Sequence, residues 1–210
     1  MDYIKNPVIK GITEKEWQEM KEAGCLRKAC FKKNEVIFRI GEMIHEIGMI
    51  LQGSAHIQTV DPLGNLSILS DVEEGEVFGE TYAFCREPLM VEVVAAKDTS
   101  LLFLDVEALQ EGDISWKKKI KENMLQISLR KNLLLSQRIF CTTPKTVRER
   151  VLTFLTAQSV RQKGKNIEIP FNRQQMADYL NLDRSALSKE LGKMKKEGIL
   201  DFHKNVFRLL

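Results

Sequence analysis

Histidine is scarce in this sequence, cysteine is never paired, and long apolar runs are missing. Three histidines without a His-x-His motif are too few ligands for the metal centre of a barrel enzyme such as a cupin. No stretch reaches the roughly 20 consecutive apolar residues of a membrane span, and the start lacks the basic-then-apolar layout of a signal peptide. We therefore expect a cytoplasmic protein that is not an enzyme, with no metal, no cofactor and no membrane partner.

The four cysteines, Cys25, Cys30, Cys85 and Cys141, form no Cys-x-x-Cys pair. Such scattered thiols are typical of reduced structural cysteines in the cytosol. An iron-sulfur redox sensor is the alternative, since four thiolates are available as cluster ligands. Their spacing gives that alternative no support.

Charge is divided unevenly along the chain. Residues 1–140 carry 18 Lys and Arg against 22 Asp and Glu, a net charge of −4, whereas residues 141–210 carry 14 against 7, a net charge of +7. A basic segment of this kind is where a polyanion binds. The rival interpretation is a C-terminal module that binds protein, and a salt-dependent shift on DNA distinguishes the two.

Short apolar runs punctuated by glycine extend from Phe31 to Leu104. They predict strands at 36–38, 49–51, 55–59, 66–69, 92–96 and 100–104, with a hairpin turn at Asp61–Asn65. Before them, Thr13 and Glu16 are spaced as a helix-capping pair. Regularly spaced short strands indicate a β-roll or jelly-roll barrel, here over residues 1–112, in a chain of the α+β class.

A long helical pattern follows, from about Asp105 to Phe140. One stripe of it is apolar at spacings of four, three and seven residues, and we expect this stripe to pair with a second copy of the chain: Ile120, Met124, Ile127 and Leu134. Leu129, Leu133 and Leu135 are then left to pack on the chain's own barrel. The alternative is that the stripe itself packs on the barrel. Residues 113–141 are thus predicted to form a dimerisation helix and hinge.

Pro144 ends that helix, and Thr143 is the expected cap of the next one, so residues 142–210 form a separate domain. The next helix places Val147, Val151, Leu152, Phe154 and Leu155 on its core side, and Ile167–Ile169 follows as a short strand.

Two short helices joined by a tight turn are predicted between Asn172 and Lys196. Asn172 and Gln175 form a capping pair, Asn181 suits a left-handed turn, and Asp183 caps the second helix. This is a helix-turn-helix, and Ala177 lets its helices approach. The alternation around Lys204-Asn205 adds a two-stranded wing.

The outward face of the second helix carries residues that read DNA. Its exposed positions are Arg184, Ser185, Ser188 and Lys189, which can donate hydrogen bonds to bases in the major groove or to phosphates. We expect five further residues to hold the DNA backbone: Arg173, Gln174, Lys193, His203 and Lys204.

The order of these parts resembles the CRP/FNR family of regulators over almost the whole chain. Asp183-Arg184-Ser185-Ala186-Leu187-Ser188-Lys189-Glu190-Leu191 is similar to the family's recognition helix, and Glu74-Gly75-Glu76-Val77-Phe78-Gly79-Glu80 is similar to the start of its phosphate-binding cassette. The resemblance implies a homodimer that binds double-stranded, palindromic operators and is controlled by an effector in the barrel. RNA polymerase is a further candidate partner, since activation requires a contact with it.

Both motifs depart from the family pattern. Met90-Val91 stands where nucleotide-binding members have an Arg-Ser pair, and a buried phosphate without a cation is unfavourable, which argues against a cyclic nucleotide. Arg86 lies too early to replace that arginine without a loop rearrangement. Ser185-x-x-Ser188-Lys189 replaces the Glu-x-x-Ser-Arg of the oxygen-sensing branch, so no operator sequence can be transferred.

The effector is therefore an open question. The residues expected to line a pocket for a small organic molecule are Phe78, Gly79, Glu80, Tyr82, Met90 and Val91, with Leu135 and Ser136 from the long helix. The alternatives are a cyclic nucleotide with a divergent cassette, a barrel filled by its own side chains in a constitutive regulator, redox control through the cysteines, and heme bound by His45 or His56.

Overall fold

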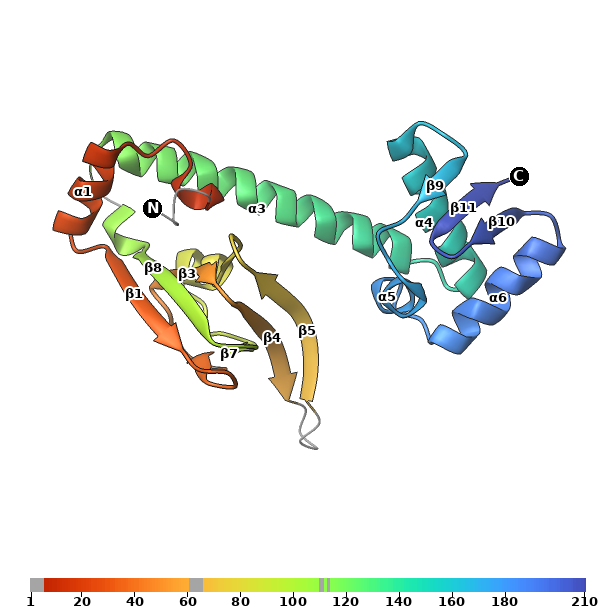
Figure 1. Cartoon of the computed structure of the whole chain (residues 1–210), viewed down its shortest axis with the longest axis horizontal. Coiled ribbons are helices and arrows are strands. Elements are labelled where there is room, and N and C mark those ends of the chain that lie inside the picture. The colour runs from red at the N-terminus through yellow and green to blue at the C-terminus, as the bar shows by residue number, and fades with distance from the viewer. Residues whose placement is uncertain (1–5, 61–65, 110–111, 113) are drawn as a thin grey trace. The chain divides into compact units, whose positions relative to one another are not determined.

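The computed structural model describes residues 6–60, 66–109, 112 and 114–210, which fall into two compact units, Met1–Ser128 and Leu129–Leu210 (Figure 1). Each unit has a hydrophobic core of its own. The boundary lies inside the long helix α3 (Ser115–Thr142), so the first half of this helix belongs to the first unit and its second half to the other.

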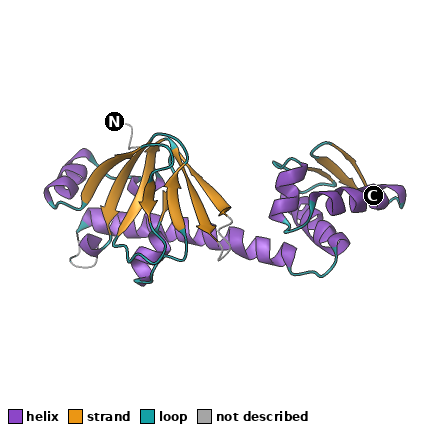
Figure 2. Cartoon of the chain, turned by 90° about the horizontal axis from the view of Figure 1, so that it is seen from below, coloured by secondary structure: helices purple, strands orange, loops and turns teal. Residues whose placement is uncertain are grey.

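Two four-stranded antiparallel sheets form the body of the first unit (Figure 2). The strand orders are β1-β8-β3-β6 and β2-β7-β4-β5. The strands are β1 (Leu26–Phe31), β2 (Val36–Phe38), β3 (Glu46–Gln52), β4 (Ser54–Val60), β5 (Leu66–Glu73), β6 (Val77–Phe78), β7 (Glu92–Ala95) and β8 (Thr99–Asp105). This confirms the predicted roll of short strands. The predicted turn at Asp61–Asn65 lies outside the described residues.

Aromatic rings fill the interior between the two sheets. The Phe38 ring lies 5.7 Å from that of Phe78 and 5.6 Å from that of Phe103, measured between centroids. A Cβ atom added at Gly48 would overlap the Phe78 ring, so glycine at this position makes room for that ring. Phe78 is therefore a core side chain that occupies the inside of the roll.

The described residues of the first unit also form short helical segments, which are η2 (Pro7–Ile9), α1 (Glu14–Glu22), α2 (Glu80–Cys85) and η3 (Glu107–Leu109). The predicted capping pair is confirmed, because Thr13 and Glu16 form a capping box at the start of α1. Glu16 also accepts hydrogen bonds from Ser115 Oγ at 2.8 Å and Lys119 Nζ at 2.7 Å. These contacts fasten α1 to the first turns of α3.

Helix α3 begins about ten residues later than the sequence pattern indicates. Strand β8 continues to Asp105, whose carboxylate accepts a hydrogen bond from the backbone amide of Glu107 at 2.8 Å and starts the short helix η3. The apolar residues after Leu104 pack in the core of the first unit from a strand end and a 3₁₀ turn. These residues have a helical spacing in the sequence, but they lie before the start of α3.

The predicted dimer stripe needs a correction. Ile120 and Met124 are buried in the core of the first unit, and Ile127 packs against that core. By contrast, Leu129, Leu133 and Leu135, expected to pack on the barrel, are each more than half exposed, as is Leu134. Helix α3 is apolar on two faces, and the first unit covers three of the four residues that had been assigned to a partner, leaving Leu134 exposed.

Helices and a small sheet make up the second unit. They are α4 (Val147–Gln162), β9 (Asn166–Glu168), α5 (Arg173–Tyr179), α6 (Arg184–Lys196), β10 (Leu200–His203) and β11 (Val206–Leu209), with the sheet order β10-β11-β9. The predicted core of α4 is confirmed, since Val151, Phe154 and Leu155 are buried and Val147 and Leu152 pack against them.

The start of α4 differs from the prediction in its capping residue. Thr146 forms a capping box with Glu149, while the Thr143 hydroxyl donates to the carbonyl of Ile139 at 2.7 Å and so closes the end of α3. Pro144 lies between the two helices. None of the helices in the described part of the chain is both long and apolar enough to span a bilayer.

Candidate nucleic-acid interface

Helices α5 and α6 form the predicted helix-turn-helix. Asn172 and Gln175 cap α5 reciprocally, Asn181 has the left-handed φ of 52°, and the Asp183 carboxylate accepts from the amide of Ala186 at 2.9 Å. The inner faces of the two helices share one core, and the fully buried members are Met176, Ala177, Leu180, Leu187, Leu191 and Met194. This core fixes the rotation of α6 about its axis and hence which of its residues face outward.

The four predicted readers lie together on the exposed face of α6. Arg184, Ser185, Ser188 and Lys189 are all exposed, in the first two turns of the helix. The hydroxyl of Ser185 donates to the Asp183 carboxylate, and this hydrogen bond, together with the amide of Ala186, lowers the pKa of Asp183. In the described part of the chain neither Arg184 nor Lys189 pairs with a carboxylate, so both cations are available to a ligand.

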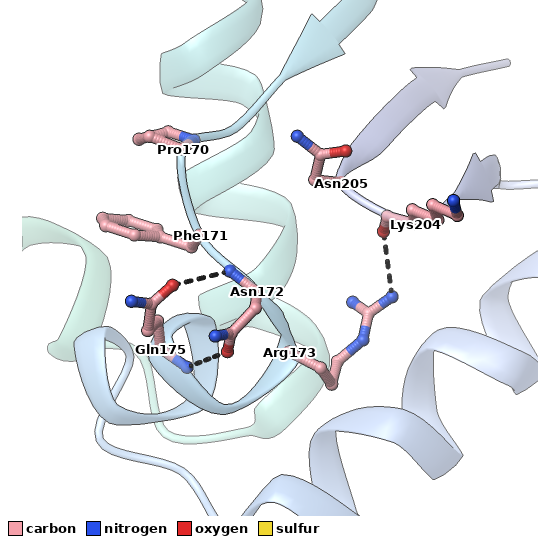
Figure 3. A pocket seen from close by; sticks show the side chains of 7 residues that line it. All are labelled: Pro170, Phe171, Asn172, Arg173, Gln175, Lys204 and Asn205. Carbon is pink, nitrogen blue, oxygen red and sulfur yellow. Dashed lines mark hydrogen bonds between the residues drawn. The ribbon is translucent and has the colours of Figure 1, made fainter.

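Arg173, predicted to hold the DNA backbone, is partly buried against the wing. Its guanidinium lies over the rings of Phe202, at 5.1 Å, and Phe207, at 5.4 Å, and it donates to the carbonyl of Lys204 at 3.4 Å. Burial lowers its pKa. Arg173 therefore fastens the wing to the start of α5, as Figure 3 shows for its bond to Lys204.

A cleft of about 510 Å³ lies between the start of α5 and the turn of the wing (Figure 3). Asn172, Arg173 and Gln175 line it from α5, and Lys204 and Asn205 from the wing. The side chains of Asn172 and Gln175 are occupied by the capping box. Lys204 is exposed and has a left-handed backbone, with φ of 52°. The ammonium group of Lys204 is thus the cation that this cleft offers to a phosphate.

The remaining predicted backbone contacts are dispersed around this surface. Gln174 is exposed and donates to Asp178 at 2.8 Å. Lys193 lies one turn beyond Lys189, 3.9 Å from the carboxylate of Glu190. His203 is exposed at the end of β10.

An arginine that the sequence analysis missed holds the recognition helix in place. Arg148, in the first turn of α4, donates to Glu190 at 2.6 Å and to both carboxylate oxygens of Glu197 at 2.7 and 3.0 Å. These bonds raise the pKa of Arg148 and lower that of Glu197. The partners lie 42 and 49 residues apart in sequence, so no local pattern reveals them.

Two further arginines bind the end of α5. Arg150 donates to the carbonyls of Pro144, Leu180 and Asn181, and Arg138, near the end of α3, donates to those of Asp178 and Tyr179. Cations are favourable at a helix C-terminus, where carbonyl groups are unpaired. The segment around Pro144 is thereby connected to the helix-turn-helix through charged hydrogen bonds.

The residues expected to bind an effector do not share one environment. Phe78 and Glu80 are buried, Tyr82 and Val91 pack against the core of the first unit, and Met90 is 74% exposed. Gly79, with a positive φ, caps α2. Leu135 and Ser136 are exposed and belong to the second unit.

The residues considered for other sensing chemistries are also placed. Arg86 lies 3.7 Å from the carboxylate of Glu107, and His45 lies 3.6 Å from the same group. His56 pairs with Asp71. Cys25 and Cys141 are buried, which raises the pKa of both thiols, and Cys30 and Cys85 are exposed. Among the described residues no three His, Cys, Asp or Glu side chains are grouped to hold a metal ion.

Comparison with known proteins matches two parts of the chain to family models. The model of the cyclic nucleotide-binding domain matches residues 28–112, and that of the Crp-like helix-turn-helix domain matches residues 149–210. The transcriptional activator protein FnrA of Stutzerimonas stutzeri is 23% identical over 184 residues, which cover 85% of this chain and 75% of that protein.

Solved structures share the fold. The catabolite activator protein of Thermus thermophilus superposes with a TM-score of 0.52 at 18% identity, covering 98% of this chain and 94% of that one. OCPA-complexed CprK superposes with a TM-score of 0.63 at 17% identity, covering 94% and 91%. The two matched domains, in this order along one chain, identify the protein as a transcription regulator of the CRP/FNR family with a DNA-binding helix-turn-helix.

Proposed function

We propose that this regulator binds a two-fold symmetric site on double-stranded DNA as a homodimer, with the first turns of α6 in the major groove. The observation that carries the proposal is the outward face of α6, where Arg184 and Lys189 are exposed without a carboxylate partner in the described chain and Ser185 and Ser188 lie beside them. Arginine and lysine donate to O6 and N7 of guanine, the commonest specific contact in this groove.

Each side chain of this surface has a distinct role. Lys189 reads a guanine, and Arg184, at the first position of the helix, contacts a base or a phosphate. Lys204 and His203 of the wing contact the DNA backbone, which sets affinity and register without sequence choice. Arg173 supports this contact by holding the wing rather than by touching a phosphate.

The second copy required for a palindromic site pairs through α3. Seven large apolar side chains on residues 125–140 of this helix are exposed: Leu125, Leu129, Leu133, Leu134, Leu135, Ile139 and Phe140. So many exposed apolar side chains are unusual on the surface of a monomer and mark an interaction site. A parallel pair of α3 helices related by a two-fold axis would bury the face that carries Leu125, Leu129 and Ile139.

The signal sensed by the first unit is not a cyclic nucleotide in this proposal. Met90 and Val91 supply no cation for a cyclic phosphate, and Arg86 is near Glu107. Phe78 fills space between the sheets, against Gly48. These features favour either a small apolar effector or a roll that is complete without one.

The test is selection of the purified protein on a randomised DNA pool followed by sequencing, with and without reductant and with a panel of effectors that includes cyclic AMP. Enrichment of a two-fold symmetric site without additions supports a constitutive or redox-controlled dimer, and enrichment that depends on one effector identifies the signal. Enrichment that requires cyclic AMP contradicts the proposed signal, and no enrichment under any condition contradicts the DNA-binding proposal.

A further inference from the structure

One side chain of the recognition helix already uses its hydrogen-bond donor inside the protein. Ser185 is the second residue of α6 and is exposed. Its hydroxyl contacts Oδ1 of Asp183, the residue that caps the helix. The same carboxylate oxygen accepts from the backbone amide of Ala186 at 2.9 Å. The Ser185 hydroxyl is therefore bound to a carboxylate that the helix itself holds in place.

The charge of Asp183 determines the direction of this hydrogen bond. The bond from the Ser185 hydroxyl and the bond from the Ala186 amide lower the pKa of Asp183 below its ordinary value, so its carboxyl group is ionised at neutral pH. An ionised carboxylate has no proton and can only accept, while a serine hydroxyl has a single hydrogen. That hydrogen points at Asp183, and the Ser185 oxygen presents only lone pairs to a ligand.

The bases of DNA are weaker competitors for this hydrogen than Asp183. A hydrogen bond to an ionised group is roughly twice as strong as one between neutral groups. The acceptors in the major groove are neutral, namely N7 of the purines, O6 of guanine and O4 of thymine. Next to these atoms the Ser185 oxygen is an acceptor without a donor, which is unfavourable. The bases that can donate to it are cytosine, through its N4 amino group, and adenine, through its N6 amino group.

The other readers on this face have a different hydrogen-bonding character. Lys189 is a donor only, and the Ser188 hydroxyl, which has no carboxylate partner among the described residues, can rotate to donate or to accept. Residues four apart on a helix have Cβ atoms about 5–6 Å apart, whereas successive base pairs are about 3.4 Å apart. Ser185 and Lys189 therefore reach base pairs that are one or two steps apart.

We propose that Ser185 is a specificity-determining residue that acts as a hydrogen-bond acceptor and selects the amino group of a cytosine or an adenine, one or two base pairs from the guanine that Lys189 reads. Asp183 is a positioning residue that acts through Ser185 by holding its hydroxyl hydrogen. The inference rests on the proposed insertion of α6 into the major groove, and it adds the class of base required at one position of each half-site.

Competition binding of the full chain to chemically modified operators tests the proposal. In the site recovered from the randomised pool, each cytosine or adenine of a half-site is replaced in turn by N4-methylcytosine or N6-methyladenine, in which a methyl group takes the place of the amino hydrogen in the major groove. At one position this change is expected to weaken binding roughly three- to tenfold. Ser185→Ala should be insensitive to that methyl group, while Ser185→Thr, which keeps a hydroxyl, and Ser188→Ala should remain sensitive.

A substitution at Asp183 separates its effect from that of Ser185. Asp183→Gly removes the carboxylate at little cost to the helix, because glycine is accepted at the N-cap. The freed hydroxyl of Ser185 can then also donate, so guanine or thymine should be tolerated at the selected position. Thr146→Gly, the same kind of change at the cap of α4, is the control and should leave the base preference unchanged.

The outcomes distinguish this inference from the function on which it rests. If an operator is enriched but every methylated version affects the unsubstituted chain and Ser185→Ala equally, the acceptor role is wrong while DNA binding stands. A preference for guanine or thymine that is lost in Ser185→Ala would make this serine a donor and overturn the proposal. An unchanged preference in Asp183→Gly would remove the role of the carboxylate. No enriched operator under any condition contradicts the proposed function and, with it, this inference.

Discussion

On α6, the exposed cations differ in whether the protein already satisfies their charge. Lys193 lies 3.9 Å from Glu190, and Lys195 pairs with Asp201 and donates to the carbonyl of Phe202. Arg184 and Lys189, by contrast, pair with no carboxylate in the part of the chain that the structure describes. A cationic side chain that has no carboxylate partner within the protein can bind a ligand without first breaking an internal ion pair.

Lys189→Ala is expected to lose about 1–3 kcal/mol of discrimination between operators that differ at one base pair, because a bidentate contact to guanine is removed. Lys204→Ala, which removes a backbone contact on the wing, should instead weaken binding to all operators by a similar factor and reduce its salt dependence. Competition binding with single-base variants of the selected site measures both effects. A uniform loss for Lys189→Ala would assign this lysine to a phosphate.

At the scale of helices and strands, charged hydrogen bonds connect elements that are far apart in the sequence. Arg148 connects the first turn of α4 to the middle and end of α6. Because these bonds join α6 to α4, the orientation of the recognition helix depends on this arginine. Arg148 is in this sense a positioning residue for DNA binding.

Arg148→Gln is expected to lower the melting temperature and to weaken binding to every operator by a similar factor, with discrimination between operators preserved. The bases are still read by Lys189, but α6 is held less firmly. A double-mutant cycle with Glu197→Gln isolates the pair, and the second substitution should add little to the first. Fully additive losses, or a change in operator preference, would argue against a positioning role.

The contact of α1 with α3 depends on one carboxylate. The hydrogen bond from Lys119, aided by those from the Thr13 backbone and from Ser115, lowers the pKa of Glu16 to about 2 from the ordinary value of 4.5. A carboxyl group with a lowered pKa contributes stability above pH 4.5, and this contribution is lost as the pH falls toward about 2.

Glu16→Gln should therefore reduce the free energy of unfolding at pH 7 by about 1–2 kcal/mol and flatten its decline between pH 4.5 and 2. Both tryptophans of the chain, Trp17 and Trp116, are buried in α1 and α3, so urea titrations followed by tryptophan fluorescence report on this region. Glu22→Gln, at an exposed position of α1, is the control. An unchanged pH dependence in Glu16→Gln would exclude this carboxylate as the source.

The elements that could be predicted from sequence are those whose signals are local. Thr13 with Glu16, Asn172 with Gln175, and Asp183 with Ala186 form their bonds within three residues, and the structure contains each of them. The Arg148 contacts span 42 and 49 residues and leave no such signal. In α3 the sequence shows apolar residues at helical spacing, but two faces of the helix carry such residues. Only the packing of Ile120 and Met124 in the core of the first unit shows which face the chain itself buries.

For the whole molecule, the burial of Ile120 and Met124 changes which residues of α3 would pair two copies in the proposed homodimer. Leu125, Leu129 and Ile139 lie on one line of the helix with Asn132 and Ser136, at successive spacings of four, three, four and three residues. This is the heptad spacing of a coiled-coil seam. Asn132 and Ser136, whose side chains are hydrogen-bonded at 3.3 Å, form its polar centre, and a polar residue in a seam specifies register at a cost in stability.

Leu129→Lys and Ile139→Lys are accordingly expected to dissociate the dimer and, because a palindromic site needs two recognition helices, to weaken operator binding at least tenfold. Leu134→Lys is the matched control, since Leu134 is 61% exposed, similar to Leu129 at 55%, but lies on the opposite side of the helix. Sedimentation equilibrium gives the dimer dissociation constant of each variant. If Leu134→Lys dissociates the dimer while Leu129→Lys leaves it intact, the two copies pair through the face of α3 that carries Leu134, which is exposed and lies outside the core that holds Ile120.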